Sequence, residues 1–426
     1  MKLILLIFTC YPIFCQNGWF NFNTSNSGLP YNDVKSIEFG SSLNSYGEIF
    51  VGTSYGLGVL QIDNENLPDN SCLSLYSQDD PNAGLLSNEI VNISKGPENK
   101  LWICTTEGIS ILEYEYSFNQ LNYQNWSFLN TSNSDISNNL IRTILFDDSI
   151  VWMGSSSGLD VKEGLTWQNY SFENEGVFSN NIKKIIKNPL TENIYIGTLN
   201  GGFQIFDGNN FEGYNNTNSG LLDNTINDFT FDSNNNLIIT SPFGGLEILT
   251  YLDNWVIFNS VTKPDLPFYI NSLNNVIVDN DNNLWISTVE NGLIKYMNNE
   301  WFFYNEENSE LPDDKINCLK YDSLHNILWI GTETEGIAML DLNFFSDTQN
   351  QINLPKFKPY FSKNNLILNN SEIGICRIYN RTGKLIHIEK ICKKNKTIRL
   401  QKLYSEFYII QLETKDEIFT ERLIKI

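Results

Sequence analysis

The sequence predicts an all-β protein that consists of a seven-bladed β-propeller followed by a small C-terminal β-sandwich. The first observation is a phrase of the type Leu-Trp-Ile-Gly-Thr, which recurs every 43 to 52 residues. That interval matches the length of a four-stranded propeller blade. The second observation is an aromatic strand pattern between these phrases, and the third is the end of both patterns after Asp341. The seven phrases occupy residues 49–53, 101–105, 151–155, 194–198, 237–241, 284–288 and 328–332.

Each repeat predicts four antiparallel strands. The repeated phrase forms one strand and leads into a turn that closes on a glycine, such as Gly56 in the first copy and Gly201 in the fourth. Glycine supplies the positive φ that such a turn requires, and an alternating apolar strand follows. An aromatic strand comes next, of which 73–76 is the weakest copy, and an apolar strand such as 226–231 then leads to the next phrase.

The two ends of the repeat region predict how the ring closes. The chain opens with an aromatic strand between Trp19 and Phe22, whereas no aromatic strand follows the last Gly-Thr hairpin at 328–340. The repeat is therefore offset by one strand. We expect the strand from Trp19 to Phe22 to be the outermost strand of the last blade, because this pairing leaves no open junction in the ring.

The first residues predict export. Lys2 precedes an apolar run at 3–14, which is too short to span a bilayer and is typical of a signal peptide. We expect cleavage after Cys15, and acylation of Cys15 as in a lipoprotein is the alternative. No later segment is apolar and long enough to cross a membrane. The predicted domains are a signal peptide at 1–15, the propeller at 16–342, a linker at 343–360 and the sandwich at 361–426.

The charge of the chain disfavours some partners. It has 50 acidic and 28 basic residues, and its formal net charge is -22. A negative charge of this size repels nucleic acid and anionic membrane surfaces, so we expect neither nucleic acid nor another polyanion as a partner. The tail differs, because basic residues crowd one stretch of it: Lys384, Lys390, Lys393, Lys394, Lys396, Arg399 and Lys402.

Export would place the cysteines in an oxidising compartment, where disulfides are allowed. Cys104 and Cys318 stand at apolar strand positions, so we expect them to be buried thiols. Cys376 and Cys392 are close in sequence within the small C-terminal domain, and the sequence leaves open whether they pair.

The repeated residues resemble a known family. From about Trp19 to Leu340, an Asn-x-Val/Ile element is followed by Leu-Trp-Ile-Gly-Thr and by Gly-Leu/Ile. This pattern resembles the two-component regulator propeller repeat, best known from periplasmic sensor halves of hybrid histidine kinases in bacteria of the Bacteroidetes type. The chain shows no kinase or DNA-binding pattern, so any signal would have to pass to another protein.

The tail resembles a second family. The segment 376–384, Cys-Arg-Ile-Tyr-Asn-Arg-Thr-Gly-Lys, occurs with Phe-Tyr-Ile-Ile at 407–410 and Arg-Leu-Ile-Lys-Ile at 422–426. Together they resemble the type A sorting domain of the type IX secretion system. The usual Pro-Asn-Pro is absent around Pro359, and Glu406 replaces a usual glycine. The resemblance implies passage across the outer membrane, followed by surface attachment or release.

The sequence offers little for catalysis. His325 and His387 are the only histidines, so no His-based triad or multi-histidine metal site can form within the repeats. We expect acidic pairs such as Asp313-Asp314 to be solvated turns. The turn at 279–283, Asp-Asn-Asp-Asn-Asn, carries oxygen ligands that suit calcium but lacks the glycine and closing glutamate of an EF-hand loop. Local hydrogen bonding is the favoured interpretation, and no metal or other cofactor is expected.

One set of positions suggests binding residues. Two residues before the predicted innermost strands stand Asn32, Asn88, Asn138, Asn180, Asn224, Phe268 and Asp314. We interpret the repeated asparagines as caps of the turn that enters each strand. Phe268 and Asp314 break this pattern, and with Tyr269 they would form an aromatic and acidic rim that suits a sugar ring or a peptide. Phe268, Tyr269 and Asp314 are therefore the candidate ligand-binding residues.

These observations predict a secreted or surface-displayed binding protein rather than an enzyme, with a propeller face that contacts an extracellular glycan or protein. The tail would engage the type IX secretion machinery. The alternative is a secreted lyase or hydrolase that acts on a polysaccharide or peptide through carboxylates at the propeller mouth. A carboxylate pair about 5 to 10 Å apart in a pocket would favour hydrolysis, and a flat polar face would favour binding. A structural surface component is the third interpretation.

Overall fold

The structure is a computed structural model of the chain. It divides into two compact units, Met1–Val256 with Ser272–Asn350 and Ile257–Asn271 with Gln351–Ile426. We call them the propeller unit and the C-terminal unit. The structure describes residues 18–40, 47–62, 68–73, 84–117, 120–174, 177–263, 266–343, 357–362, 365–370, 374–380, 384–391, 396–399, 407–413 and 418–424.

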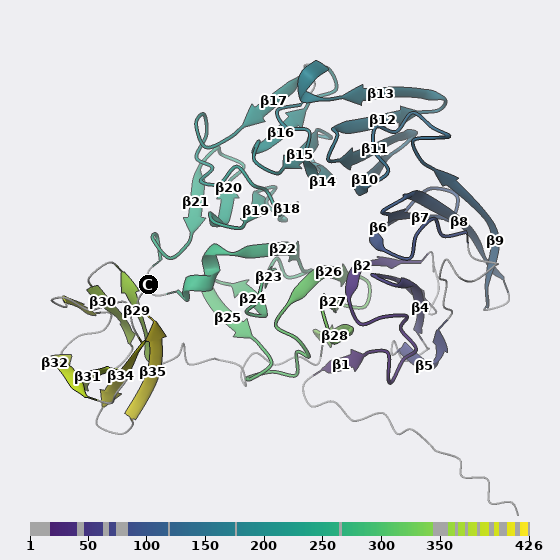
Figure 1. Cartoon of the computed structure of the whole chain (residues 1–426). Coiled ribbons are helices and arrows are strands. Elements are labelled where there is room, and N and C mark those ends of the chain that lie inside the picture. Colours follow the sequence, from purple (N-terminus) through teal and green to yellow (C-terminus); the bar gives the residue numbers. More distant parts are fainter. Residues whose placement is uncertain are drawn as a thin grey trace, which may run out of the picture. The chain divides into compact units, whose positions relative to one another are not determined.

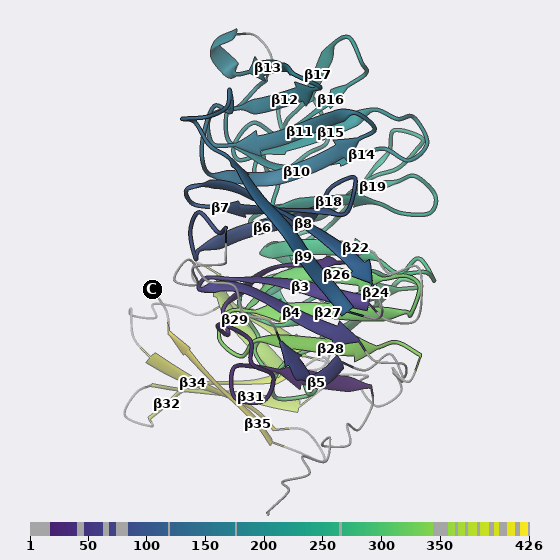
Figure 2. The same cartoon turned by 90° about the vertical axis from the view of Figure 1, so that its right-hand side faces the viewer.

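Within the described residues, seven four-stranded antiparallel sheets form the blades of a β-propeller (Figure 1). The first three blades are β2 (Val34–Phe39), β3 (Gly47–Thr53), β4 (Gly56–Ile62) and β5 (Pro68–Leu73); β6 (Ile90–Lys95), β7 (Lys100–Thr105), β8 (Gly108–Ser117) and β9 (Gln120–Leu129); and β10 (Ile141–Asp147), β11 (Ile150–Ser155), β12 (Leu159–Glu163) and β13 (Thr166–Tyr170). The β8–β9 hairpin runs diagonally across the outer edge of this unit (Figure 2).

The next three blades follow the same order. They are β14 (Ile182–Lys187), β15 (Ile194–Thr198), β16 (Phe203–Phe206) and β17 (Phe211–Tyr214); β18 (Asp228–Phe231), β19 (Leu237–Ser241), β20 (Gly245–Leu249) and β21 (Trp255–Phe258); and β22 (Leu273–Val278), β23 (Leu284–Thr288), β24 (Leu293–Met297) and β25 (Glu300–Tyr304). Two short 3-10 helices, η1 (Phe172–Asn174) and η2 (Phe268–Asn271), precede β14 and β22.

The last blade confirms the predicted closure of the ring. It contains β26 (Ile316–Asp322), β27 (Ile327–Thr332) and β28 (Ile337–Asp341), and β1 (Trp19–Phe22) is its outermost strand. In the β1–β28 pair, Trp19 lies opposite Leu340 and Phe22 opposite Ile337. The chain therefore joins its first strand to its last hairpin, as the offset of the repeats predicts.

The Gly-Thr phrase has two structural roles. The threonine hydroxyl donates a hydrogen bond to the carbonyl of the glycine that ends the turn, as in Thr53 to Gly56 at 2.8 Å and Thr332 to Gly336 at 2.9 Å. The glycine allows the next blade to approach, since a Cβ on Gly52 would lie 2.6 Å from the Ile90 side chain. Its place at the end of the second strand therefore serves packing between blades.

The tryptophan of the phrase packs between neighbouring blades. Trp329 is fully buried in a cluster that also contains Val34 and Ile37 of the first blade, and Trp285 is buried with Ile316 of the last blade. Each blade thus shares its core with the next one. This arrangement explains why the apolar residues repeat with the blade period.

Two local predictions need correction. The fourth strand of the first blade, β5 (Pro68–Leu73), starts at Pro68 rather than at residue 73, and residues 74–76 of the predicted strand lie outside the described residues. In the fourth copy the positive φ, 77°, belongs to Gly202 rather than Gly201. Gly201 instead donates its N–H to the Thr198 hydroxyl at 3.0 Å, which shifts the left-handed position by one residue.

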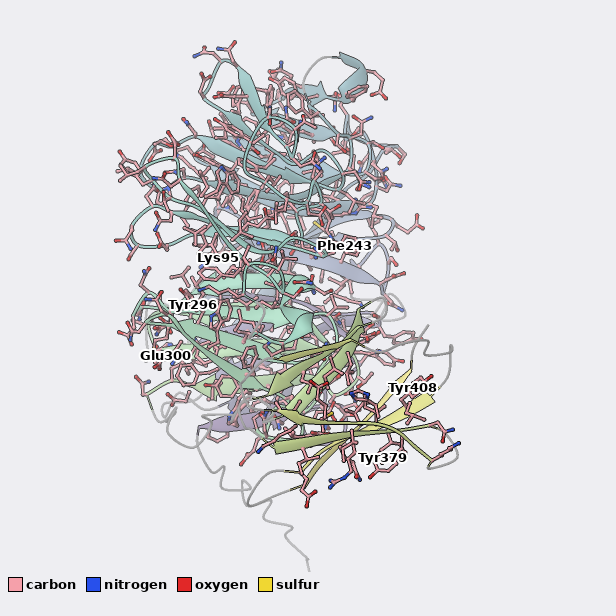
Figure 3. All side chains as sticks on the ribbon, turned by 90° about the vertical axis from the view of Figure 1, so that its left-hand side faces the viewer. Lys95, Phe243, Tyr296, Glu300, Tyr379 and Tyr408 are labelled. Atoms are coloured by element: carbon pink, nitrogen blue, oxygen red, sulfur yellow. The ribbon has the colours of Figure 1, made fainter. Side chains whose placement is uncertain are left out.

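The C-terminal unit contains two antiparallel sheets. One consists of β29 (Phe357–Ser362), β30 (Asn365–Asn370) and β33 (Lys396–Arg399), and the other of β32 (Leu385–Ile391), β31 (Gly374–Asn380), β34 (Phe407–Glu413) and β35 (Ile418–Ile424). Leu366 of β30 and Ile398 of β33 share a buried core with Cys376 and Tyr408 of the other sheet, which confirms the sandwich. Tyr408 lies on β34, next to the strand that carries Tyr379 (Figure 3).

The sandwich begins earlier than predicted. β29 starts at Phe357, inside the predicted linker 343–360. Pro359 lies within β29, and β29 is an edge strand, where the missing N–H of proline is tolerated. Cys376 is buried, whereas Cys392 lies outside the described residues, so their pairing stays a prediction. No helix in the described part of the chain is long and apolar enough to cross a membrane.

Candidate functional site

A polar channel of about 610 Å³ lies at the centre of the propeller unit. Most of its lining comes from the innermost strand of each blade, namely β2, β6, β10, β14, β18, β22 and β26, and the adjoining turns add Glu89, Thr106 and Leu140. This volume falls within the usual range of pockets that hold small molecules. The channel is therefore the natural candidate site of the propeller unit.

A repeated β-bulge directs side chains into this channel. In β2 the register shifts between Val34 and Ser36, and five other innermost strands in the described part of the chain shift at the equivalent place. A bulge of this kind changes the direction of side chains within a strand. Two successive residues from each blade line the channel, in β18 without a register shift: Lys35-Ser36, Val91-Asn92, Arg142-Thr143, Lys183-Lys184, Asn227-Asp228, Asn274-Asn275 and Asn317-Cys318.

The second residue of several pairs holds the blades together. The Ser36 hydroxyl accepts a hydrogen bond of 3.0 Å from the backbone N–H of Ile93 in the next blade. Asp228 Oδ2 accepts a bond of 3.2 Å from the N–H of Val276 in the same way. These side chains join neighbouring strands across the ring. Part of the polar lining is thus structural rather than available to a ligand.

The lining of the channel has more basic than acidic residues, whereas the propeller as a whole has more acidic than basic ones. Between Trp19 and Leu340 the sequence contains 41 acidic and 12 basic residues. The basic ones are Lys35, Lys95, Lys100, Arg142, Lys162, Lys183, Lys184, Lys187, Lys263, Lys295, Lys315 and Lys320. Five of these line the channel, against three lining acids, Glu38, Glu89 and Asp228. Basic residues are therefore concentrated where the blades converge.

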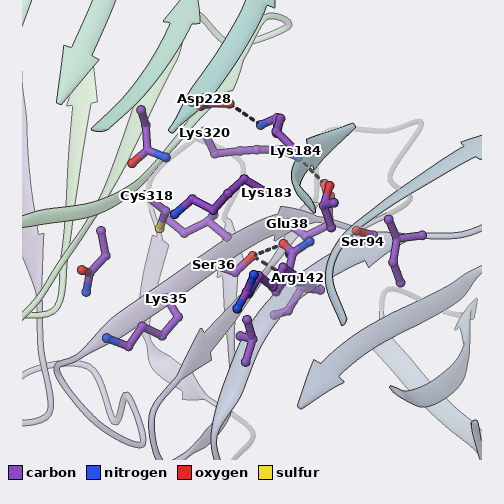
Figure 4. A pocket seen from close by; sticks show the side chains of 18 of the residues that line it. Lys35, Ser36, Glu38, Ser94, Arg142, Lys183, Lys184, Asp228, Cys318 and Lys320 are labelled. Atoms are coloured by element: carbon purple, nitrogen blue, oxygen red, sulfur yellow. Dashed lines mark hydrogen bonds and ion pairs between the residues drawn. The ribbon is translucent and has the colours of Figure 1, made fainter. Parts of the chain in front are cut away.

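Three of the five channel cations form an ion pair. The lysine nitrogen lies 2.8 Å from a carboxylate oxygen in each case, and the pairs are Lys35 with Asp33, Lys184 with Asp228, and Lys320 with Glu38. Figure 4 shows the Lys184–Asp228 pair at one side of the channel. The carboxylates Glu38 and Asp228 are engaged by these lysines.

Arg142 and Lys183 have no carboxylate partner among the described residues. The Arg142 guanidinium donates to the neutral amide oxygen of Asn181, and the Lys183 ammonium makes no hydrogen bond or ion pair there. Burial lowers the pKa of Arg142. Burial, followed by the positive charge of Arg142, lowers the pKa of Lys183, although Asp228 acts in the opposite direction. Two cations thus face the channel with their charges unbalanced.

Asp314, a candidate binding residue, has the role of a turn cap. Its Oδ1 accepts a hydrogen bond of 2.9 Å from the Glu306 N–H. Asn224 makes the same bond to the Asn216 N–H at 2.8 Å. Asn32, Asn180 and Asn224 thus have the predicted role of turn caps, and Asp314 belongs to the same set rather than departing from it.

Two members of the predicted set are wrong. Asn271, not Phe268, stands two residues before β22 and accepts a hydrogen bond of 2.8 Å from the Ser260 N–H. Asn139 replaces Asn138 in the third blade, where it accepts from the Thr131 N–H at 2.8 Å. η2 precedes β22, so the strand starts later than the sequence suggests.

The predicted rim stays a prediction. Phe268 opens η2 and Tyr269 follows it, but their side chains lie outside the described residues. Asp314 is described and half-buried, and its carboxylate is occupied by the turn bond. A ligand role of Phe268, Tyr269 and Asp314 therefore rests on the sequence argument alone.

The other polar candidates are accounted for by local bonds. Asp279 Oδ1 accepts from the Asn283 N–H at 2.8 Å and its Oδ2 from the Trp285 indole at 2.9 Å, which confirms local hydrogen bonding in that turn. Asp313 is in a turn as expected, but it is buried rather than solvated, since Thr334 donates two bonds to it. Among the described residues, no cluster of three or more His, Cys, Asp or Glu could hold a metal ion.

The predicted thiols are buried to different degrees. Cys104 is fully buried, which confirms its prediction, whereas Cys318 is partly buried and belongs to the channel lining. Burial raises the pKa of the Cys318 thiol to about 12. At neutral pH this thiol is therefore neutral and does not balance the charge of the channel.

Comparison with known proteins shows likeness in fold. No protein-family model and no curated protein matches the sequence. The extracellular domain of the putative hybrid two component system BT3049 from B. thetaiotaomicron matches with a TM-score of 0.58 and 16% identity, over 96% of this chain and 55% of that one. PorZ, a surface component of the type-IX secretion system of Porphyromonas gingivalis, matches with a TM-score of 0.54 and 14% identity, over 92% and 60%.

A third match is the structure of streptogramin B lyase, with a TM-score of 0.54 and 10% identity over 76% of this chain and 97% of that one. The chain spans only 55% to 60% of the length of the first two proteins. At these identities the matches establish the β-propeller fold and no more.

Proposed function

We propose that this chain is a secreted or cell-surface binding protein whose propeller holds a ligand in its central channel and whose C-terminal unit directs export through the type IX secretion system. The observation that carries the proposal is the channel itself. Every blade contributes two successive side chains to it, and six of the seven innermost strands carry a bulge at this place. Such an arrangement suits recognition by a rigid scaffold, because the side chains are fixed by the strands before any ligand arrives.

The state of the carboxylates favours binding over hydrolysis. A glycosidase or a carboxylate-based lyase needs a carboxyl group that is free to exchange a proton with its substrate. Asp228 is held by Lys184 and by the backbone N–H groups of Phe229 and Val276. Glu38 is held by Lys320. Glu89 is then the single lining carboxylate without an ion pair among the described residues, whereas glycoside hydrolysis uses two carboxyl groups. We therefore rank the lyase or hydrolase alternative below a binding function.

Two kinds of similarity support the proposed location. The 1–15 segment resembles a signal peptide and the tail resembles a type A sorting domain. The fold is shared with an extracellular domain and with a surface component of a type IX secretion system. Both kinds of similarity favour a location outside the cell.

Fractionation tests the export part of the proposal. The full chain and a version truncated after Leu354 would be expressed in a bacterium that has a type IX system. We expect the full chain on the surface or in the medium and the truncated chain in the periplasm. A truncated protein that reaches the outside as efficiently as the full chain would refute the sorting role. Tryptophan fluorescence of the purified truncated protein is the control for folding of the propeller.

A binding screen tests the remaining part. Purified full-length protein would be applied to arrays of glycans and peptides, and any hit would be repeated with substitutions in the channel. We expect hits that depend on the channel residues. Turnover of a hit compound would instead favour the lyase or hydrolase alternative.

A further inference from the structure

We propose that Arg142 and Lys183 form an oxyanion-binding site inside the central channel. The site would take a carboxylate, phosphate or sulfate group of a small hydrophilic solute. This inference rests on the proposed binding function of the channel and adds the chemical class of the ligand to it.

The backbone places the two side chains together. Arg142 and Lys183 each occupy the first position of the bulge pair, on β10 and β14. These two innermost strands are neighbours in the ring and contact each other. Both side chains line the same channel (Figure 4). The equivalence of their positions means that they lie at a similar depth on adjacent walls.

Their hydrogen-bonding capacity is largely unused. A guanidinium carries five N–H donors and an ammonium carries three. Among the described residues Arg142 gives one hydrogen bond, to the neutral Asn181 amide, and Lys183 gives none. Donors of this kind suit the oxygens of a carboxylate, phosphate or sulfate, and the planar guanidinium can bind two of these oxygens at once.

The lining carboxylate of Asp228 does not neutralise Arg142 and Lys183. Asp228 attracts Lys183 electrostatically, but its Oδ1 lies 2.8 Å from the Lys184 nitrogen. Its oxygens also accept the N–H groups of Phe229 and Val276. The excess of positive charge in this part of the channel therefore persists in the folded chain.

An empty site of this kind carries a cost in stability. Two like charges that are partly removed from water repel each other, and the lowered pKa of both Arg142 and Lys183 reflects that burial. An anion between them would relieve the repulsion. The repeats contain 41 acidic residues, yet cations are concentrated in the channel. Neither solubility nor packing alone explains this distribution of charge.

The lining also limits the size and character of the solute. None of the residues that line the channel in the described structure is aromatic, so the channel offers no ring for stacking with a sugar or a base. The surrounding acidic surface would repel a long polyanion at the entrance. A small solute with one or two oxyanion groups and otherwise polar atoms fits both conditions.

Thermal unfolding of the purified full chain tests this site. Sodium sulfate, sodium phosphate and sodium citrate would be titrated separately, with ionic strength kept constant by sodium chloride. We expect the Tm to increase with at least one of these anions because binding stabilises the folded state. Sulfate or phosphate would indicate a tetrahedral oxyanion, and citrate alone would indicate a carboxylate.

Lys183→Gln and Arg142→Gln are the test variants, and Lys162→Gln is the matched control because Lys162 lies on β12, outside the channel. Loss of one charged donor should weaken anion binding by about ten- to a hundredfold in calorimetric titration. Without anion, Lys183→Gln should be at least as stable as the wild type, since it removes a repelling charge. Lys162→Gln should bind as the wild type does.

Two results would overturn the inference. The first is the absence of any anion-specific increase in Tm, and the second is an equal increase in the wild type and in Lys183→Gln. Neither result bears on export or on hits in the array screen, so failure of the oxyanion site is distinguishable from failure of the proposed binding function.

Discussion

Replacing Glu247 with glutamine should make the propeller more stable at neutral and alkaline pH. Glu247 lies on β20 and is completely buried. Its Oε2 accepts a hydrogen bond of 2.6 Å from the Leu222 N–H, and its Oε1 accepts one of 3.2 Å from the Ser241 hydroxyl. Gln204 has the same role in the preceding blade, where it accepts from the Phe178 N–H at 2.8 Å. The preceding blade therefore already holds a glutamine at this position, and the Ser241 hydroxyl beside Oε1 offers the new amide a partner that the buried Nε2 of Gln204 lacks among the described residues.

The size of the effect follows from the pKa of Glu247. Burial, which outweighs the hydrogen bonds, raises this pKa from 4.5 to about 7. Because the folded pKa is raised, the protonated group favours folding below pH 4.5, and this contribution is lost as the pH rises through 7. One pKa unit corresponds to about 1.4 kcal/mol, so the loss above pH 7 is at most ~3 kcal/mol. Glutamine stays neutral and avoids this loss.

Urea unfolding followed by tryptophan fluorescence between about pH 4 and pH 9 measures the effect. The two proteins should be about equally stable at the acidic end, and Glu247→Gln should be more stable by up to ~3 kcal/mol at the alkaline end. Other carboxylates titrate alike in both proteins, so the difference isolates Glu247. Gln204→Glu is the reciprocal control and should lose stability as the pH rises. A Glu247→Gln variant with the pH dependence of the wild type would show that Glu247 does not cause this loss of stability.

Three further predictions follow from the packing and the turns. Gly292→Ala should destabilise the chain by about 2 kcal/mol or more, because Gly292 has a φ of 79° and the new Cβ would lie 2.1 Å from the Tyr304 carbonyl oxygen. Gly164→Ala is the matched control and should cost only ~1 kcal/mol, because Gly164 has a φ of 57° but no atom within 4 Å of the new Cβ. Trp19→Ala should cost about 3 to 5 kcal/mol in urea unfolding, since this side chain is 2% exposed in the closing blade, and a loss below ~1 kcal/mol would contradict its role there. If the Asp314 carboxylate acts as a turn cap, Asp314→Asn should change the stability by less than about 0.5 kcal/mol, whereas Asp314→Ala should cost ~1 kcal/mol. Calorimetric Tm values of the two variants would show this difference.

Much of the fold was predictable because the repeated residues are the ones that the packing of the blades requires. The phrase that ends in Gly-Thr recurs wherever a hydroxyl must hold a turn and a neighbouring blade must come close, as at Gly52 and Thr53. The offset of the aromatic strands predicted that β1 would pair with β28, and this pairing is found. These features depend on residues that are near one another in the chain or that repeat with the blade period.

The site was less predictable because it depends on single-residue shifts. A bulge in β10 and another in β14 bring Arg142 and Lys183 into the channel. Each bulge interrupts the regular alternation of side chains between the two faces of the strand, and the pattern of apolar residues in the sequence does not reveal it. Likewise, η2 delays the start of β22, so Phe268 was mistaken for the counterpart of Asn271. One signal was present in the sequence: several of the few basic residues of the repeats stand directly after the first buried residue of an innermost strand.

If the convergence of seven blades creates a cationic site in the channel, diffraction from crystals soaked in sodium selenate should show an anion bound there. Selenate has the shape and charge of sulfate, and selenium is located by its anomalous signal. We predict an anomalous peak in the channel, with selenate oxygens about 3 Å from the Arg142 guanidinium and the Lys183 nitrogen. Selenate found only on the outer surface, with the channel free of it, would show that the channel holds no such site.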